Sequence, residues 1–223
     1  MTAMALLGRG GFIIKVCGVT TEEDGLVASS AGANAIGLNF YSRSPRFVTL
    51  EAARRIAAVL PRDVLKVGVF VNEPAEGIFE FARAVALDIV QLHGPHLPAG
   101  LPQALRIWRA ISVDEHFSSK SFDHLKAEAY LLDTPSPQAG GSGKAFDWRR
   151  IVDISERFVL AGGLDGGNVG HAISQVRPWG VDACSRLESA PGRKNEAKVR
   201  QFVSSALAAY KALKGEAEPL VIR

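Results

Sequence analysis

Two side chains with complementary acid–base chemistry stand at the ends of apolar segments that are far apart in the sequence. Cys17 ends the segment 12–17, FIIKVC, and Asp133 ends the segment 129–133, AYLLD. A cysteine has a reference pKa of about 8.5, so nearby positive charge or helix N-termini would help it to act as a base. A carboxyl acts as an acid near neutrality when burial or an adjacent anion raises its pKa. Placed across one cavity, the two groups would form an acid–base pair.

Both residues also have ordinary structural interpretations. A cysteine in a buried strand commonly serves as a small apolar side chain. An aspartate ahead of a loop commonly caps or turns the chain. The segment after Asp133 is rich in proline and glycine, contains the sequence GGSG at 140–143, and ends at Asp147, which can cap a following helix. A carboxylate beneath such a loop is also a common arrangement for a catalytic acid under a lid.

A second group of residues suggests anion binding. Gly162 and Gly163 precede a predicted helix, and Ser185 and Arg186 follow a predicted strand. Exposed glycine N–H groups and a helix N-terminus suit a phosphate dianion, although turn glycines are the alternative. Arg46 can pair with a carboxylate through two hydrogen bonds, and otherwise it is a solvated loop arginine.

Further polar residues fall at predicted strand ends, namely Gln91, His93 and Asp182. His93 has no partner at a metal-binding spacing, so we expect it to have a supporting role and expect no metal site. Trp108 and Trp179 are expected to pack in the protein rather than to stack on a ligand.

The composition places broad limits on function. The chain has 223 residues, of which 47% are hydrophobic and 22% charged, which is typical of a globular protein with a large core. The net charge of +3 comes with no dense basic run, so a nucleic-acid partner is not expected, and a small anionic substrate is compatible. Cys17 and Cys184 fit neither a disulfide framework nor a zinc motif, which favours a cytoplasmic location. No apolar stretch is long enough to predict a membrane span.

Short strands, apolar on both faces, alternate with helices. Strands are predicted at 12–17, 35–40, 65–71, 88–93, 105–111, 129–133, 157–162 and 180–184. Helices are predicted from Thr20 or Thr21 to about Gly32, at about 50–60, after Pro74, within 113–126, at about 168–176 and at about 195–213.

This alternation predicts an α/β protein, a single-domain (β/α)8 TIM barrel at residues 12–214. Residues 1–11 would form a loose extension and residues 215–223 a frayed tail. The alternative is a doubly wound open sheet, but the turn after the first strand reads CGVT and lacks the GxGxxG fingerprint. In a barrel, the residues named above would gather at the carboxyl ends of the strands.

Several motifs follow one another in an order that is specific as a set. They are KVCGVT at 15–20, GLNFY at 37–41 with SPR at 44–46, VGVFVN at 67–72, VQLHG at 90–94, LLDT at 131–134, GGSGK at 140–144 with FDW at 146–148, AGGL at 161–164 with NV at 168–169, and PG at 191–192. The chain closely resembles the phosphoribosylanthranilate isomerase family of tryptophan biosynthesis, from Ile14 to about Phe202.

The resemblance implies an Amadori rearrangement without metal or cofactor. N-(5-phosphoribosyl)anthranilate becomes 1-(2-carboxyphenylamino)-1-deoxyribulose 5-phosphate. It implies that Asp133 is the general acid that opens the furanose ring and that Cys17 is the general base that removes the C2′ proton. Arg46 would hold the anthranilate carboxylate. Phosphate would bind at Gly143, Gly162, Gly163, Ser185 and Arg186, with Gln91, His93 and Asp182 in support. The only partner expected is an anionic phosphosugar substrate, and the protein is expected to be a monomer or a homodimer.

The sequence departs from the family after the eighth predicted strand. The usual DVSSGVE is here DACSRLE at 182–188, so Arg186 replaces a glycine. Arginine would be strained if the position needs a positive φ, and otherwise its guanidinium could contact phosphate. We hypothesise the second. Asn195 replaces a usual aspartate and is expected to matter little.

Two further hypotheses concern oxidation and function. The first and eighth strands of a barrel are neighbours, so Cys17 and Cys184 could form a disulfide if their Cα atoms lie within about 7 Å. A non-catalytic barrel that binds sugar phosphate, and a related isomerase acting on a histidine-pathway aminoaldose, are the functional alternatives. The second of these typically uses paired aspartates, unlike the pairing of Cys17 with Asp133.

Overall fold

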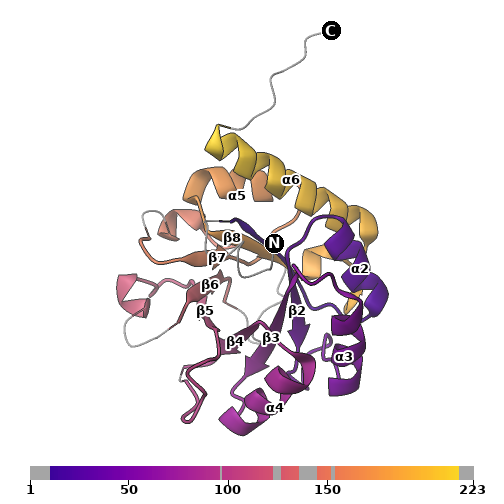
Figure 1. The fold of residues 1–223 in the computed structure, drawn as a ribbon. Helices are drawn as coiled ribbons and strands as arrows, with labels where there is room; N and C mark the ends of the chain where they lie inside the picture. The colour runs from indigo at the N-terminus through magenta and orange to yellow at the C-terminus, as the bar shows by residue number, and fades with distance from the viewer. Residues whose placement is uncertain (1–10, 96, 123–126, 136–144, 152–153, 216–223) are drawn as a thin grey trace.

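Eight parallel strands close into a barrel in chain order (Figure 1). The computed structural model describes residues 11–95, 97–122, 127–135, 145–151 and 154–215. The predicted TIM barrel is confirmed, and the open sheet is excluded because β1 pairs with both β2 and β8. The strands are β1 (Ile13–Cys17), β2 (Ala35–Asn39), β3 (Leu65–Val71), β4 (Ile89–His93), β5 (Ile107–Ser112), β6 (Ala129–Asp133), β7 (Phe158–Leu160) and β8 (Gly180–Ala183).

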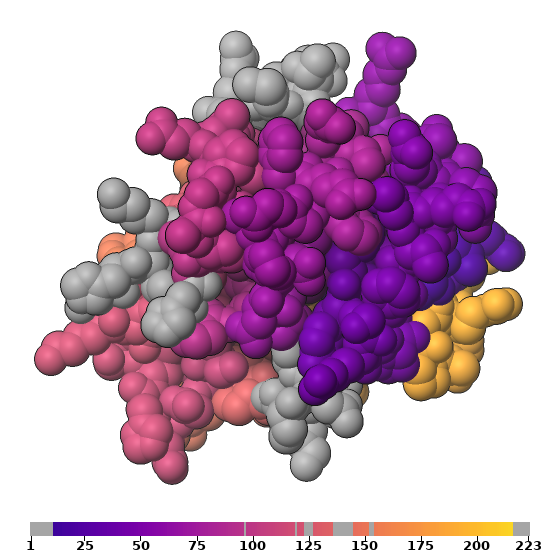
Figure 2. Space-filling view, turned by 90° about the horizontal axis from the view of Figure 1, so that it is seen from below, coloured from indigo at the N-terminus to yellow at the C-terminus, as the bar shows by residue number. Residues whose placement is uncertain are grey.

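Helices surround the first and last parts of the barrel (Figure 1). They are α2 (Glu22–Ser30), α3 (Leu50–Val59), α4 (Ala75–Val85), α5 (Val169–Val176) and α6 (Glu196–Lys214). In Figures 1 and 2, the yellow helix α6 lies beside the indigo N-terminal part of the chain, where it contacts α2. Among the described residues, no helix is long and apolar enough to cross a membrane.

The middle of the chain is less helical than predicted. The helix expected within 113–126 is, in its described part, a short 3-10 helix, η1 (Ser119–Phe122). Side chains there hydrogen-bond the local backbone, since Asp114 accepts from the N–H of His116 at 2.9 Å and Ser121 accepts from that of Ser118 at 3.1 Å. Such bonds compete with those of an α-helix. A second short 3-10 helix, η2 (Trp148–Ile151), precedes β7, with Asp147 accepting from the N–H of Arg149 as a cap.

Of the predicted helix starts, those of α2 and α6 have side-chain capping bonds, whereas Asn168 forms none at the start of α5. Thr21, rather than Thr20, caps α2 by accepting from the N–H of Asp24 at 3.1 Å. Asn195 caps α6 by accepting from the N–H of Lys198 at 3.1 Å. Asparagine and aspartate are equally good caps, so replacing the usual aspartate leaves this helix start intact.

The core has two apolar layers. The outer layer lies between sheet and helices and includes Ile14 and Val16 of β1. The inner layer fills the barrel and includes Ile13 and the fully buried Trp108, whose ring meets that of Trp179 edge-on with centroids 5.7 Å apart. Both tryptophans therefore pack, as predicted. Alternation along β1 places Lys15 and Cys17 on the inner face, above this apolar floor.

An antiparallel hairpin follows the barrel's last strand. A short 3-10 helix, η3 (Ser185–Leu187), leads into β9 (Glu188–Ala190), which pairs with β10 (Arg193–Lys194). Gly192 turns the hairpin with a φ of 79°. The predicted extension 1–11 and tail 215–223 fall almost wholly outside the described residues.

Candidate active site

The carboxyl ends of β1, β6 and β8 bring Cys17, Asp133 and Asp182 to the same end of the barrel. The thiol of Cys17 lies against Gly37 on the neighbouring strand, where an added Cβ would be 2.6 Å from the sulfur. Glycine at this position gives the buried thiol its space. The sequence-based expectation that these polar residues share one end of the barrel is thus met.

One of these residues, Asp182, forms a buried ion pair with Lys15. Lys15 Nζ is 3.0 Å from Asp182 Oδ1, and the lysine is fully buried. Burial alone would lower the pKa of Lys15, but attraction to Asp182 and Cys17 outweighs burial and raises the pKa. Burial raises the pKa of Asp182 despite the lysine. No role was predicted for Lys15 from the sequence, although a lysine in an otherwise apolar strand, two residues before the candidate base, was the available signal.

The environment of Cys17 favours its thiolate. A hydrogen bond with Cys184 has the largest effect and, together with the charge of Lys15, outweighs burial and lowers the pKa of Cys17 to about 7. The same hydrogen bond raises the pKa of Cys184. Cys184 therefore retains its proton and donates it toward the sulfur of Cys17. Both cysteines are free thiols in this structure.

The environment of Asp133 favours its protonated form. Burial, followed by repulsion from Asp182, raises the pKa of Asp133 to about 6. A hydrogen bond from the Thr134 N–H to Oδ1, 2.7 Å long, acts in the opposite direction. The arrangement thus meets the requirement for a carboxylic acid that works near neutral pH.

A pocket beside Asp133 contains most of the predicted phosphate-binding residues. Gly162 and Gly163, with φ of 86° and 62°, form one wall, and η3 forms another. Gly143 lies outside the described residues. The pocket is lined by Asp133, Ala161, Gly162, Gly163, Leu164, Asp182, Ala183, Cys184, Ser185 and Arg186.

Arg186 occupies the family's glycine position without strain. Among the described residues, the non-glycine positions with positive φ are Asn72, Ala86 and Arg177. Arg186 is not one of them, so the strained alternative is excluded. Its side chain is 46% exposed and forms an ion pair with Asp165, with Nη2 2.5 Å from Oδ2. The guanidinium therefore lies at the rim of the pocket.

Gln91 and His93 are two residues apart on β4, so their side chains share one face of the strand. Gln91 Nε2 lies 2.9 Å from His93 Nε2. Burial, with the charges of Lys15 and Arg109, lowers the pKa of His93 to about 4, so its ring is neutral. Arg109 is a buried arginine of β5 that donates to the carbonyl of Gly94 at 2.5 Å, and no local pattern in the sequence predicts this role.

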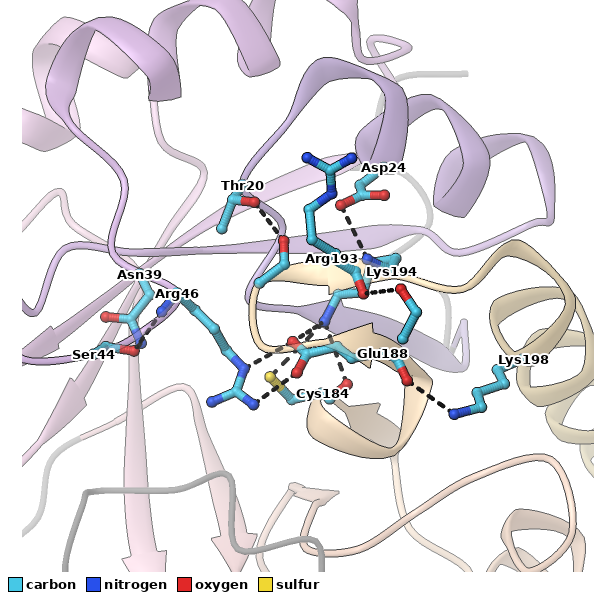
Figure 3. A network of polar contacts seen from close by, with 12 residues as sticks. Thr20, Asp24, Asn39, Ser44, Arg46, Cys184, Glu188, Arg193, Lys194 and Lys198 are labelled. Carbon is cyan, nitrogen blue, oxygen red and sulfur yellow. Dashed lines mark hydrogen bonds and ion pairs between the residues drawn. The ribbon is translucent and has the colours of Figure 1, made fainter.

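Arg46 is held by Glu188, a partner that was not predicted from the sequence. Its Nε and Nη2 donate to the two carboxylate oxygens of Glu188 at 2.8 and 2.7 Å (Figure 3). Glu188 also pairs with Lys194 at 3.0 Å. The side chain of Arg46 and the thiol of Cys184 both lie beside Gly18. A Cβ added to Gly18 would be 2.6 Å from Arg46 Cδ and 2.9 Å from Cys184 Sγ.

Taken together, these groups define a class of protein. A thiol that readily loses its proton and a carboxyl that readily keeps one lie at the carboxyl ends of barrel strands, where barrel enzymes hold their active sites. The fold and the site are those of a (β/α)8-barrel enzyme equipped for general acid–base chemistry.

Comparisons with known proteins identify the family. The family described as N-(5'-phosphoribosyl)anthranilate (PRA) isomerase matches residues 14–205. The enzyme of that name from Solibacter usitatus is 48% identical over 198 residues, covering 88% of this chain and 98% of the relative. The chain belongs to the N-(5'-phosphoribosyl)anthranilate isomerase family, which provides the isomerase of tryptophan biosynthesis. The predicted family and reaction are confirmed, and the aminoaldose isomerase is excluded.

Solved structures agree with this assignment. A crystal structure of monomers of the dimeric phosphoribosylanthranilate isomerase of Thermotoga maritima is 37% identical, with a TM-score of 0.75, and covers 88% of this chain and 98% of that one. A phosphoribosylanthranilate isomerase solved in complex with reduced 1-(o-carboxyphenylamino)-1-deoxyribulose 5-phosphate is 34% identical, with a TM-score of 0.74 and the same coverage.

Proposed function

We propose that this chain performs its isomerase reaction with Cys17 as the general base and Asp133 as the general acid, on N-(5-phosphoribosyl)anthranilate. The observation that carries the proposal is that both residues lie at one end of the barrel and are influenced by the same buried pair, Lys15 and Asp182. Near neutral pH, a minority of molecules holds the thiolate and the carboxylic acid at the same time.

The chemistry follows from these two protonation states. Asp133 donates its proton to the furanose ring oxygen as the C1′–O bond breaks, which leaves a Schiff base. The thiolate of Cys17 removes the C2′ proton, which the adjacent cationic C=N has made acidic, and an enolamine results. The enolamine loses its C2′ hydroxyl proton and gains one at C1′, giving the ketone. A proton passes from Cys17 back to Asp133 to complete the cycle, so no net proton is consumed.

The two anionic ends of the substrate need separate binding sites. The relative that was solved with a reduced carboxyphenylamino sugar phosphate supports a ligand with a carboxylate and a phosphate. We assign the carboxylate to Arg46, which is held near the thiol end. We assign the phosphate to the pocket of Gly162, Gly163, Ser185 and Arg186, with Gly143 as a further contact. Gln91, His93 and Asp182 support the site without contacting the reacting atoms.

The cellular setting is also part of the proposal. Two free thiols, one of them a candidate catalytic base, suit a reducing cytoplasm. The solved relative from Thermotoga maritima is described as dimeric, which supports a homodimer. The expectation of a monomer or a homodimer stays a prediction for this chain.

Turnover of freshly prepared phosphoribosylanthranilate, followed by the loss of its fluorescence, tests the assignment. Cys17→Ala and Asp133→Asn should each lower kcat by roughly 10²- to 10⁴-fold, as is typical when a general base or acid is removed. Ser29→Ala, on the surface of α2, is the matched control and should keep wild-type rates. A wild type that binds the reduced product analogue without turnover would instead support a non-catalytic barrel.

A further inference from the structure

The hairpin after β8 supplies a carboxylate to the arginine of the opposite loop. Glu188 begins β9, and Arg46 follows β2, yet their side chains form two hydrogen bonds of 2.8 and 2.7 Å (Figure 3). The Arg46 side chain is 12% exposed and that of Glu188 only 4%. The arginine side chain is therefore the more accessible of the two, and the glutamate side chain is the more buried. This is a supporting position for Glu188 rather than a ligand-contacting one.

A second cation, Lys194, donates to the same carboxylate oxygen that accepts from Arg46 Nε. Lys194 Nζ lies 3.0 Å from Glu188 Oε1, donates to the carbonyl of Cys184 at 3.3 Å, and is completely buried. Burial raises the pKa of Glu188, but hydrogen bonds from Arg46 and the charge of Lys194 outweigh burial and lower it. Glu188 is thus ionised between two cations, which leaves this three-residue cluster with one net positive charge.

The geometry leaves part of the guanidinium available. A guanidinium has five N–H donors, and Glu188 occupies the Nε–Nη2 edge. Within the described part of the chain, no hydrogen bond involves Nη1 of Arg46. The Nη1–Nη2 edge can therefore form a second pair of parallel bonds with another carboxylate. Gly18, directly after Cys17, allows the arginine side chain to pass near the thiols, because any Cβ there would collide with it.

Both partners are anchored to the backbone, so the pair is preorganised. Ser44 Oγ accepts from the N–H of Arg46 at 3.1 Å and from Asn39 Nδ2 at 3.2 Å. On the hairpin side, Lys198 Nζ donates to the Glu188 carbonyl at 2.8 Å, and the Lys194 N–H donates to Asp24 Oδ2 at 3.1 Å (Figure 3). A side chain whose orientation is fixed before binding loses little entropy when a ligand arrives.

We propose that Glu188, itself held by Lys194, is a positioning residue that aims the unoccupied edge of Arg46 at the aryl carboxylate of the substrate. It thereby makes the enzyme selective for N-aryl ribosylamines with an ortho carboxylate. This inference rests on the proposed function, in which Arg46 receives that carboxylate. Glu188 acts through the arginine and does not contact the substrate.

The test compares two ligands that differ only in the carboxylate. They are the reduced 1-(2-carboxyphenylamino)-1-deoxyribulose 5-phosphate and its phenylamino counterpart, with Kd measured by calorimetry. Glu188→Gln should weaken binding of the carboxylated ligand by roughly 10- to 100-fold, the usual range for a charge-assisted hydrogen bond, and leave the other Kd unchanged. In an Arg46→Ala background the same substitution should have no further effect. Glu196→Gln, an exposed glutamate paired with Arg200 on α6, is the control.

Other results would overturn the inference. An equal loss for both ligands would mean that Glu188 only maintains the fold, and tighter binding of the carboxylated ligand would mean that it competes with substrate. If Glu188→Gln does not fold, Glu188→Asp retains the charge on a shorter side chain and should lose only part of the carboxylate preference. Turnover of the wild type is measured in parallel. If the wild type turns over substrate and Glu188→Gln keeps the wild-type preference for the carboxylated ligand, only the positioning role is refuted. If the wild type does not turn over substrate, the proposed function is refuted.

Discussion

Lys15 and Asp182 form an ion pair inside the barrel, with Nζ and Oδ1 3.0 Å apart, and both charges act on the candidate base and the candidate acid. The lysine lowers the pKa of Cys17, and the aspartate raises the pKa of Asp133. The hydrogen bond from Cys184 is the largest effect on Cys17 and burial is the largest on Asp133, and the ion pair adds to each of these two shifts toward neutrality. Neither charged residue needs to touch the substrate to have this effect.

Replacing Lys15 with methionine should therefore weaken Cys17 as a base more than it weakens substrate binding. Without the cation, the pKa of Cys17 rises, so its alkylation by iodoacetamide should require higher pH. The maximum of the pH–rate profile should become lower and move to higher pH, and kcat/KM at neutral pH should fall by up to roughly 10-fold for each unit of pKa. Breaking a buried pair typically costs about 3–5 kcal/mol of stability, less where the stranded Asp182 can take a proton.

The control is Lys66→Met. Lys66 lies at the amino end of β3, away from the site, and pairs with Asp88 at 2.9 Å. It should leave the pH dependence of alkylation as in the wild type. Alkylation is assigned to Cys17 or Cys184 by mass spectrometry of the peptides. An unchanged alkylation profile in a folded Lys15→Met protein would show that the lysine does not influence the thiol.

The pH dependence of kcat/KM should be bell-shaped, with a maximum near pH 6.5. Below a pH of about 7, Cys17 gains a proton and the base is progressively lost. Above a pH of about 6, Asp133 loses its proton and the acid is progressively lost. The limbs belong to the coupled pair rather than to single residues. Rates that keep rising at alkaline pH would contradict the role of Asp133 as the acid.

Much of this arrangement could be predicted, because it depends on local pattern. Apolar strands alternating with helices indicate the barrel, and the barrel rule places Cys17 and Asp133 at one end. The Lys15–Asp182 and Arg46–Glu188 pairs could not be predicted in this way. Each joins strands or loops far apart in sequence, and no local pattern reveals which charge will neutralise a buried partner. The missing helix near η1 had only a weak helical pattern, and local side-chain bonds outweighed it.

Oxidation should inactivate the enzyme reversibly. β1 and β8 pair up to Val16 and Ala183, so Cys17 and Cys184 are the next residues on neighbouring strands and share a hydrogen bond. Neighbouring strands lie about 4.8 Å apart, within the roughly 7 Å that a disulfide allows. Oxidised glutathione would convert the two thiols into one disulfide and release two molecules of reduced glutathione.

Activity should fall as this bond forms and return with dithiothreitol, while mass spectrometry detects the linked peptides. Cys184→Ser removes the second sulfur but keeps a hydroxyl donor toward Cys17. It should therefore stay active and should not form the intramolecular disulfide. Inactivation of the wild type without linked peptides would assign the loss to a mixed disulfide on Cys17 alone.

Arg186→Gly restores the family's usual residue and tests whether the arginine contacts phosphate. The backbone at Arg186 is not in the left-handed region, so glycine relieves no strain, and the ion pair with Asp165 places the guanidinium at the pocket rim. Because the side chain is half exposed, the loss should be modest, roughly a 3- to 10-fold rise in KM and in the inhibition constant of inorganic phosphate, with kcat unchanged. Arg193→Gly, in the exposed hairpin, controls for the loss of one positive charge. An unchanged KM in Arg186→Gly would restrict the arginine to its pairing with Asp165, and phosphate binding would then depend on the glycine backbone and Ser185.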